Sequence, residues 1–278
     1  MAAYQHRTIF VGDIRTHFLE AGSGPDLILL HGGEYGASAE ITWRYNIEAL
    51  AQRFHVVAPD LLGWGQTDKI YSFSDPAGFR IKHLQRFLEA LGIGKAYFVG
   101  NSAGGGLILR ASVRRPPPLE IVKMATICGN ASVFKTRSQA DLENYTPSLE
   151  NMRKMVALLY HDPKWQTEEN VRERYQCSII PGAWEALSAA RLRSPAHQAR
   201  TTTEEFVKEL SRLDIPLLIM SCEHDPLNQR DWDVNFQKIV PGSKVHRFKH
   251  SAHEPQIEES EEFNRVLTEF LLDEDRRA

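Results

Sequence analysis

Gly100-Asn101-Ser102-Ala103-Gly104 is a Gly-x-Ser-x-Gly pentapeptide that lies between two apolar segments. The run 96–99 before it predicts a short buried strand, and the apolar stretch 105–111 after it predicts a helix. A sharp strand-to-helix turn exposes a serine hydroxyl above a sheet, and its strained backbone leaves little room for flanking side chains. This context favours a catalytic rather than a structural role for Ser102.

The segments around this turn alternate between strand-like and helix-like patterns, which is typical of an α/β fold with a mainly parallel central sheet flanked by helices. The exception is a β-hairpin at the start, with its turn at Gly12-Asp13. Predicted strands cover 8–11, 14–18, 27–30, 55–58, 96–99, 121–127, 217–220 and 245–248, and predicted helices cover 43–54, 79–91 and 263–271.

The alternation stops in the middle of the chain. From about residue 132 to residue 212 the sequence is helix-like and poor in strand patterns, with helix starts at Thr146-Pro147 and Thr167. We therefore expect a helical lid (cap) domain, 132–212, inserted into an α/β-hydrolase core domain formed by 1–131 and 213–278.

Bulk properties restrict the function further. The 278 residues are 42% hydrophobic and 25% charged with a net charge of −3, which offers no basis for binding nucleic acid or an anionic membrane. The beginning of the chain lacks a signal-peptide pattern, and no apolar run approaches the roughly 20 residues of a membrane span. Three cysteines without metal-ligand spacing indicate free thiols. These features predict a cytoplasmic enzyme with a small-molecule substrate.

A serine nucleophile needs a general base and a carboxylate that orients the base. In this kind of fold both follow the serine in the order acid, then histidine, each in a loop after a strand. Asp225 and His253 meet these conditions, so Ser102, Asp225 and His253 form the expected triad. Glu223 and Asp231 are alternative acids that would require a shifted loop.

Other histidines near the triad are less suited to catalysis. His250 is close to His253 but is read as a solvated loop residue, and His224 with Glu223 has no third ligand at suitable spacing for a metal. The sequence therefore predicts neither a metal site nor a cofactor, because a hydroxyl, an imidazole, a carboxylate and backbone donors suffice for the chemistry.

His31-Gly32-Gly33 follows the predicted strand 27–30, where the second half of an oxyanion hole is expected. Two backbone N–H groups must point at the negative charge that develops on the carbonyl oxygen, and losing one typically costs about 3–4 kcal/mol. Ala103 and Gly33 are the predicted donors. The alternative role for His31 is to brace this loop.

With these residues in place, the chain resembles the α/β-hydrolases, and within them the meta-cleavage product hydrolases, which cut carbon–carbon bonds in ring-opened aromatic catabolites. The resemblance covers nearly the whole chain. It rests on His31-Gly32-Gly33 with Gly36-Ala37, Asp60-Leu61-Leu62-Gly63-Trp64-Gly65, Val99-Gly100-Asn101-Ser102, Glu262-Phe263-Asn264-Arg265 and, more specifically, the lid motifs Glu150-Asn151-Met152-Arg153, His161-Asp162-Pro163 and Arg172-Glu173-Arg174-Tyr175.

The resemblance implies roles for further residues. Arg174 matches the lid arginine that contacts the dienoate end of the substrate, and Asn101 matches a polar residue that helps to hold the same end. An arginine suits this task because its fork of donors fits a carboxylate. Without the resemblance, Arg174 would be read as a surface cation on a charged helix. Members of the family are commonly dimers or larger, which favours a homo-oligomer.

The chain departs from the family pattern around the expected substrate pocket. Glu34-Tyr35 replace a glycine and a proline after Gly32 and Gly33, Thr42 stands where many members carry a substrate-contacting asparagine, and Glu254 replaces an aromatic residue after His253. We expect Gly32, Thr42 and Glu254 to border the substrate. These departures lie around the predicted substrate pocket, so they bear on the identity of the substrate and not on the triad.

Three functions are compatible with the sequence. The first is hydrolysis of a carbon–carbon bond in a vinylogous 1,5-diketone such as a 2-hydroxy-6-oxo-dienoate. The second is an esterase or lactonase that uses the same triad, and the third is a hydrolase-fold receptor that turns its ligand over slowly. The resemblance favours the first of these functions.

Overall fold

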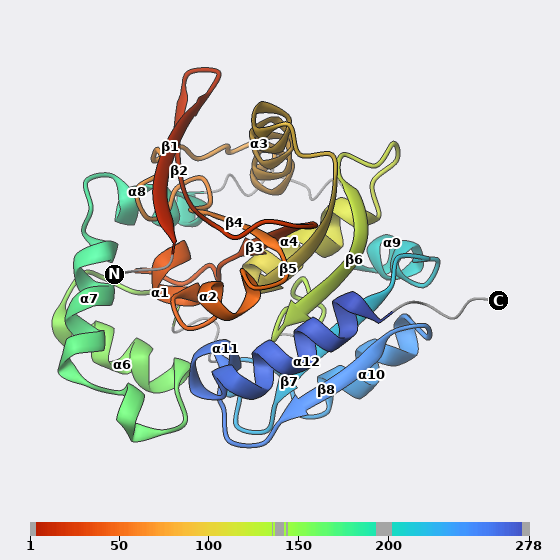
Figure 1. Cartoon of the computed structure of the whole chain (residues 1–278). Coiled ribbons are helices and arrows are strands. Elements are labelled where there is room, and N and C mark those ends of the chain that lie inside the picture. Colours follow the sequence, from red (N-terminus) through yellow and green to blue (C-terminus); the bar gives the residue numbers. More distant parts are fainter. Residues whose placement is uncertain (1–3, 135, 137–141, 143, 193–201, 274–278) are drawn as a thin grey trace.

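The computed structural model describes residues 4–134, 136, 142, 144–192 and 202–273 (Figure 1). Its sheet has eight strands in the order β1-β2-β4-β3-β5-β6-β7-β8. The first two strands pair antiparallel with each other, β2 pairs antiparallel with β4, and the remaining pairs are parallel. The predicted mainly parallel α/β sheet is confirmed. The strands are β1 Gln5–Val11, β2 Ile14–Ala21, β3 Asp26–Leu30, β4 His55–Pro59, β5 Lys95–Asn101, β6 Glu120–Ile127, β7 Leu217–Cys222 and β8 Lys244–Phe248.

Helices cover both faces of this sheet, and none of those in the described part of the chain is long and apolar enough to cross a membrane. They are α1 Ala39–Trp43, α2 Ile47–Leu50, α3 Pro76–Leu91, α4 Ala103–Ser112, α6 Leu149–Leu159, α7 Glu168–Ser178, α8 Ala183–Ser188, α9 Thr203–Leu210, α10 Trp232–Ile239, α11 Pro255–Glu258 and α12 Ser260–Leu272, with short 3-10 turns at Pro163–Trp165 and Ala189–Leu192.

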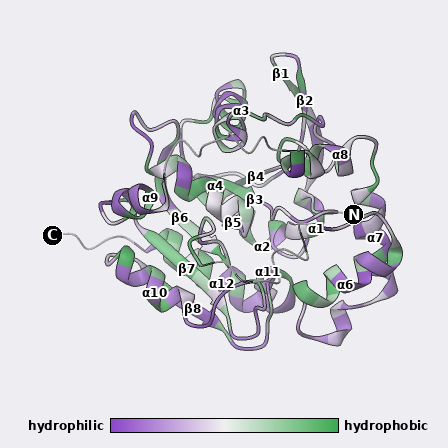
Figure 2. Cartoon of the chain, turned by 180° about the vertical axis from the view of Figure 1, so that it is seen from behind, coloured by the Kyte–Doolittle hydropathy of each residue, from purple (hydrophilic) through white to green (hydrophobic). Residues whose placement is uncertain are grey.

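The two faces of the sheet follow from the alternation of side chains along each strand. In β3, Ile28 and Leu30 pack into a core with α3, α4 and α10, whereas Leu27 and Leu29 pack into a second core with α1, α2 and α12. Figure 2 shows the contrast between the interior and the surface. Central strands carry hydrophobic colour, and outward elements such as α9 carry hydrophilic colour. Because both faces are covered, the central strands carry apolar residues on both faces.

The segment predicted to form the lid holds helices α6 to α9 and no strand among its described residues. Thr167 caps α7 as predicted, and Ser148, two residues after the predicted start at Thr146, caps α6. Met152, Met155 and Leu159 of α6 form a third apolar core that includes Tyr35 of the sheet domain. Figure 1 shows α6 and α7 grouped together, away from α9 and α10.

The sequence prediction was wrong about one helix. The segment 43–54 holds only one short helix, α2, because α1 begins earlier, at Ala39, and ends at Trp43, and Asn46 begins α2. The buried Asn46 side chain donates to the backbone oxygen of Gln256. This tertiary contact secures the break between α1 and α2, and a helical pattern does not reveal it.

The carboxyl ends of the parallel strands lie at one edge of the sheet, which is where ligands bind in open α/β folds. Loops after β3, β5, β7 and β8 carry Gly33, Ser102, Asp225 and His253, respectively. The fold therefore brings all four to one edge, although 220 positions separate the first from the last in the sequence.

A substitution at Gly100 tests how closely β5 and α4 pack against each other at the turn. A Cβ atom there would lie 2.4 Å from the backbone of Gly104 and Gly105, so we expect Gly100→Ala to lower the free energy of unfolding by about 1–3 kcal/mol. Gly94→Ala is the matched control, because nothing lies within 4 Å of its added Cβ, and it should be neutral or stabilising by up to about 1 kcal/mol. Urea unfolding measures both, and equal stability of the two variants would contradict this account.

Candidate active site

Ser102 occupies a strained turn between β5 and α4. Its φ of 48° and ψ of −110° are unusual for a residue with a side chain, and its N–H donates to the backbone oxygen of Ile127 at 2.7 Å. Gly129 lies so close that a Cβ atom added to it would be 2.6 Å from the backbone oxygen of Ser102. This strain matches the nucleophile turn expected from the pentapeptide.

His253 is bonded to Asp225, as the sequence predicted. The His253 Nδ1 and Asp225 Oδ2 atoms are 3.0 Å apart, and both side chains are buried. Asp225 also accepts from the Leu227 N–H and from the Asn228 side chain, at 2.9 and 2.7 Å. The alternative acids Glu223 and Asp231 instead pair with Arg247 at the surface.

Electrostatics support a base held by its carboxylate. Burial disfavours the imidazolium, but the charge and hydrogen bond of Asp225 outweigh it and raise the pKa of His253 well above its ordinary value of 6.5. Burial likewise opposes ionisation of Asp225, but His253 and the Asn228 amide lower its pKa. Among the hydrogen bonds of the described residues none joins Ser102 to His253, and such contacts often tighten only when substrate binds.

Gly33 and Ala103 lie side by side, as the two halves of an oxyanion hole must. A Cβ atom on Gly33 would lie 2.6 Å from the Ala103 methyl group, so only glycine allows this approach. Ala103 is the first residue of α4, and N–H groups in a first helical turn have no partner within the helix. The arrangement can offer backbone donors to an oxyanion next to Ser102.

His31 braces this loop from behind. Its Nε2 accepts from the Leu61 N–H at 2.9 Å, so its Nδ1 carries the proton that bonds to the Gly32 oxygen at 2.6 Å. Burial lowers the pKa of His31, which keeps the ring neutral for this arrangement. His31 is fully buried and absent from the described lining of the cavity, which supports the bracing role.

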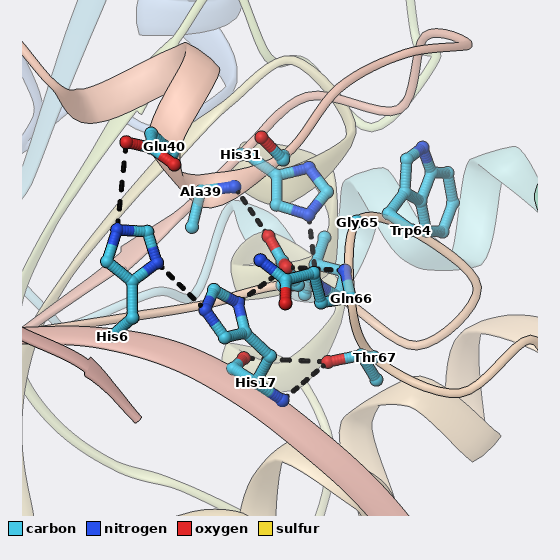
Figure 3. Close-up of polar contacts among 12 residues, drawn as sticks. His6, His17, His31, Ala39, Glu40, Trp64, Gly65, Gln66 and Thr67 are labelled. Atoms are coloured by element: carbon cyan, nitrogen blue, oxygen red, sulfur yellow. Dashed lines mark hydrogen bonds and ion pairs between the residues drawn. The ribbon is translucent and has the colours of Figure 1, made fainter. Parts of the chain in front are cut away.

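Asp60 joins the oxyanion loop to the sheet. Its carboxylate accepts from the N–H groups of Ala39 and Gln66 and from His17 Nδ1, at 2.7 to 2.8 Å. Figure 3 shows His17, Ala39 and Gln66 around one carboxylate, with His6 next to His17 on its left. This network explains why an Asp-Leu-Leu-Gly-Trp-Gly stretch accompanies the glycine-rich loop.

A cavity of about 500 Å³ opens onto the candidate triad. Ser102, His253, Gly33 and Ala103 all contribute to its wall. The described part of the segment predicted to form the lid adds Ser132, Leu142, Leu187, Ala190 and Arg191. The cavity has the size of a small-molecule site, and the nucleophile, base and oxyanion donors all face it.

Arg174 is placed differently from its predicted role. It lies on α7 of the lid but is fully buried and is not among the described residues that line the cavity. Its Nη1 donates to Glu34 Oε1 at 3.0 Å, and its Nη2 lies 2.6 and 2.7 Å from the Glu254 oxygens. Tyr160 also contacts Nη2, at 2.7 Å. Reading Arg174 as a surface cation is wrong, and its contact with substrate stays a prediction.

The four remaining predicted contacts also lie behind the wall of the cavity, since none is among its described lining residues. Asn101 is buried and donates to the His253 backbone oxygen at 3.1 Å. Gly32 lies beside it, because an added Cβ would be 2.7 Å from Asn101 Oδ1. Thr42 is buried on α1, and its hydroxyl has no partner among the described residues, while Glu254 faces Arg174.

One group of described residues has the spacing of a metal site, namely Cys128, Asp225 and His253. Two of these are the bonded triad pair, so the same proximity is explained by the hydrogen bond between them. Cys128 and Cys222 are free thiols with sulfur atoms 3.6 Å apart. His224 stacks on His161 at 3.7 Å, and His250 is exposed, so neither belongs to the cavity.

The sequence analysis missed Asn228 and Arg110. Asn228 joins Asp225 to the Cys128 backbone oxygen at 2.9 Å and accepts from Asn130 at 2.6 Å, so it helps to hold the acid. Its position three residues after Asp225 was a usable signal, because Asn commonly bonds to nearby turn residues. Arg110 lines the cavity from α4, and its spacing of eight residues from Ser102 could have indicated this.

Comparison with known proteins identifies the family. The alpha/beta hydrolase family matches residues 27–266, so the chain belongs to the alpha/beta hydrolase family. It is 30% identical over 272 residues to a 2-hydroxymuconate semialdehyde hydrolase of Pseudomonas putida, covering 97% of this chain and 95% of the relative. It is also 28% identical over 274 residues to a 2-hydroxy-6-oxo-2,4-heptadienoate hydrolase of Pseudomonas putida, covering 97% of each chain.

Solved structures agree with this assignment. A meta-cleavage product hydrolase from Pseudomonas fluorescens superposes with a TM-score of 0.84 at 29% identity, covering 95% of this chain and 97% of that one. A carboxylesterase from Bacillus subtilis superposes with a TM-score of 0.77 at 19% identity, covering 98% and 92%, and so shows only the shared fold. The resemblance to meta-cleavage product hydrolases, made from sequence, is confirmed.

Asp225→Asn tests the link between the acid and the base. Catalysis requires neutral His253, so kcat/KM should rise with pH and reach half its plateau above pH 6.5, because Asp225 raises the pKa of His253. Without the carboxylate, burial lowers the pKa of His253, so the acidic limb of the kcat/KM profile should move to lower pH. We also expect kcat to fall by roughly 10⁴. Asp231→Asn, at an exposed carboxylate, is the control and should leave the pH profile unchanged. An unshifted limb in Asp225→Asn would rule out this coupling.

Glu254→Gln tests the buried charge cluster through stability. Burial and the nearby Glu34 raise the pKa of Glu254 to about 7, despite the attraction of Arg174. The folded protein therefore holds this proton more tightly than the unfolded chain, and stability present below pH 4.5 is lost as pH rises through 7. The variant should lose this dependence, which amounts to roughly 3 kcal/mol at most.

Urea unfolding at pH 5, 6, 7 and 8 measures the effect of Glu254→Gln. Glu261→Gln, which changes an exposed carboxylate at the start of α12, is the matched control and should retain the slope of the parent protein. The same fall in unfolding free energy in all three proteins would contradict a raised pKa at Glu254.

Proposed function

We propose that this chain is a serine hydrolase that cleaves a carbon–carbon bond next to a ketone in ring-opened products of aromatic degradation, of the 2-hydroxy-6-oxo-dienoate type. The observation that carries the proposal is one cavity walled by Ser102, His253, Gly33 and Ala103, in a chain similar to meta-cleavage product hydrolases over 97% of its length. A cavity of about 500 Å³ is large enough for such a substrate.

The proposed reaction uses these groups in sequence. The substrate enol first becomes its keto form, and His253 helps to move that proton. His253 then accepts the proton of Ser102 as the hydroxyl oxygen attacks the remote carbonyl, whose oxyanion receives hydrogen bonds from Gly33 and Ala103. The carbon–carbon bond breaks, and the leaving carbon takes the proton that His253 holds. His253 then accepts a proton from water as the water oxygen attacks the acyl group, and it returns this proton to the Ser102 oxygen as the carboxylic acid leaves.

We propose this enzyme to be cytoplasmic and to act without a cofactor. The three cysteines are free thiols, including Cys128 and Cys222 with sulfur atoms only 3.6 Å apart, which suits a reducing compartment. Every proton transfer and charge in the proposed steps is assigned to a side chain or backbone group of the chain itself.

Ester or lactone hydrolysis is the second candidate, and one observation favours it. Arg174, the residue expected to bind a dienoate carboxylate, is already paired with Glu34 and Glu254. A neutral ester needs no such arginine. Substituting Arg174 would not separate the two functions, because removal of the cation leaves two buried carboxylates unpaired and destabilises the protein.

A substrate panel separates the candidates. Steady-state rates are measured for ring-fission products with methyl, carboxyl and phenyl groups on the remote carbonyl, and for p-nitrophenyl esters of matched size. We expect at least one ring-fission product to be turned over with a higher kcat/KM than the esters. Ser102→Ala should lower kcat by roughly 10⁶ for every substrate, because the nucleophile is common to both reactions.

Turnover of the esters alone would reject the carbon–carbon reaction and leave ester hydrolysis as the function. A burst with an activated ester followed by almost no steady turnover would instead support a slow receptor. Retention of activity in Ser102→Ala would reject the serine mechanism for both candidates.

A further inference from the structure

Arginines from α3, α4 and the turn after α8 line the cavity. Its described lining includes three arginines, Arg80, Arg110 and Arg191, and one carboxylate, Glu34. The Arg80 guanidinium lies 4.6 Å from the Trp64 ring centroid, and Arg191 donates to the Tyr35 hydroxyl at 3.1 Å. An anionic group on the substrate is therefore attracted into this cavity.

Arg110 differs from Arg174 in its partners. Its Nη2 donates to the Ala131 backbone oxygen at 2.8 Å, and its guanidinium lies 4.9 Å from the Phe206 ring centroid. Burial, together with the charge of Arg114, disfavours its cation and lowers its pKa. Within the described chain no carboxylate pairs with Arg110, so its charge faces the cavity without a counterion.

The position of Arg110 on α4 directs it toward the nucleophile. Ala103, Gly106, Leu107 and Arg110 are spaced three and four residues apart, and all four line the cavity along one face of the helix. Side chains on a helix lean toward its N-terminus, and Arg110 follows this direction, because it bonds to Ala131, whose Cα would lie 3.2 Å from a Cβ on Gly106, one turn earlier. Arg110 is about 12 Å along the helix from Ser102, so its guanidinium can hold a carboxylate roughly 6–8 Å from a carbonyl at Ser102.

Arg174, in contrast, has no charge left for a substrate. Glu34 and Glu254 both contact its guanidinium. Burial opposes ionisation of Glu34, but the Arg174 charge lowers its pKa, so the ionised Glu34 neutralises Arg174 and would repel a substrate carboxylate. The Glu34 side chain also fills the space between Arg174 and Gly32. A Cβ atom added to Gly32 would lie 2.3 Å from Glu34 Oε2 and 2.7 Å from Asn101 Oδ1. Glu34 thus occupies the position that the resemblance assigns to the dienoate carboxylate.

We propose that Arg110 is the specificity-determining residue that binds the substrate carboxylate, and that Glu34 excludes this carboxylate from Arg174. This inference rests on the proposed hydrolase function and adds the orientation of its substrate. The anionic end lies along α4, and the carboxylate and the attacked carbonyl are separated by a chain of about five or six carbon atoms, which matches the roughly 6–8 Å reach from Arg110.

Arg110→Gln tests the proposal with two substrates that differ only in charge, a 2-hydroxy-6-oxo-dienoate and its primary carboxamide. The variant should raise KM for the carboxylate at least tenfold and change KM for the carboxamide less than twofold. Arg114→Gln is the matched control, because Arg114 is a nearby cation that pairs with Asp75 and does not line the described cavity. It should change neither value.

Arg110→Lys separates charge from shape. Because lysine retains the charge, this variant should keep most of the preference for the carboxylate, and equal losses in the Lys and Gln variants would overturn the proposal. So would an equal loss of both substrates in Arg110→Gln. A tenfold gain in kcat/KM for the carboxylate in Glu34→Gln, with no effect of Arg110→Gln, would place the carboxylate at Arg174 instead.

The proposed function and this inference can fail separately. If the parent protein cleaves neither the dienoate nor its carboxamide, carbon–carbon hydrolysis is rejected. The p-nitrophenyl ester of hexanoic acid and the p-nitrophenyl monoester of adipic acid then supply a neutral and an anionic substrate of equal chain length. A selective loss of the adipate ester in Arg110→Gln would still support an anion site at Arg110, and no selectivity would overturn it.

Discussion

The buried guanidinium of Arg174 is the contact on which the geometry of the site depends. It joins α7 of the lid to Glu34 in the oxyanion loop and to Glu254, the residue after His253. A charge without water is tolerated only when partners surround it, so each of the three segments is held in place by the other two. The segment predicted to form the lid is thereby tied to the loops that carry the predicted oxyanion donors and the predicted base.

This cluster also changes the polarity of the substrate site. In the resemblance to meta-cleavage product hydrolases, the lid arginine serves the substrate, whereas here two carboxylates of the chain itself surround it. Glu34 and Glu254 stand at two of the positions where the chain departs from the family pattern. The same two substitutions therefore create the ion pairs with Arg174. The arginines that line the described cavity are Arg80 on α3, Arg110 on α4 and Arg191 in the turn after α8.

Much of the site could be predicted because its determinants are local. The turn at Ser102 needs glycines within a few residues, and Asp225 and His253 each follow a strand that the apolar pattern reveals. Asn46 shows the opposite case, since the break between α1 and α2 depends on a bond to Gln256, 210 residues away. Helix propensity depends on neighbouring residues and carries no information about a contact 210 residues away. The prediction of a single helix was therefore wrong.

By itself the sequence determined the strand–turn–helix around Ser102, the alternation that builds the sheet, and the order of nucleophile, acid and base, because each follows from the spacing of neighbouring residues. Only the tertiary structure decided which charges meet. Arg174 pairs with Glu34 across 140 positions and with Glu254 across 80, and no local pattern links these residues. Charge pairing in a buried site depends on distances in space, so only the folded structure decided that Arg174 is paired within the chain.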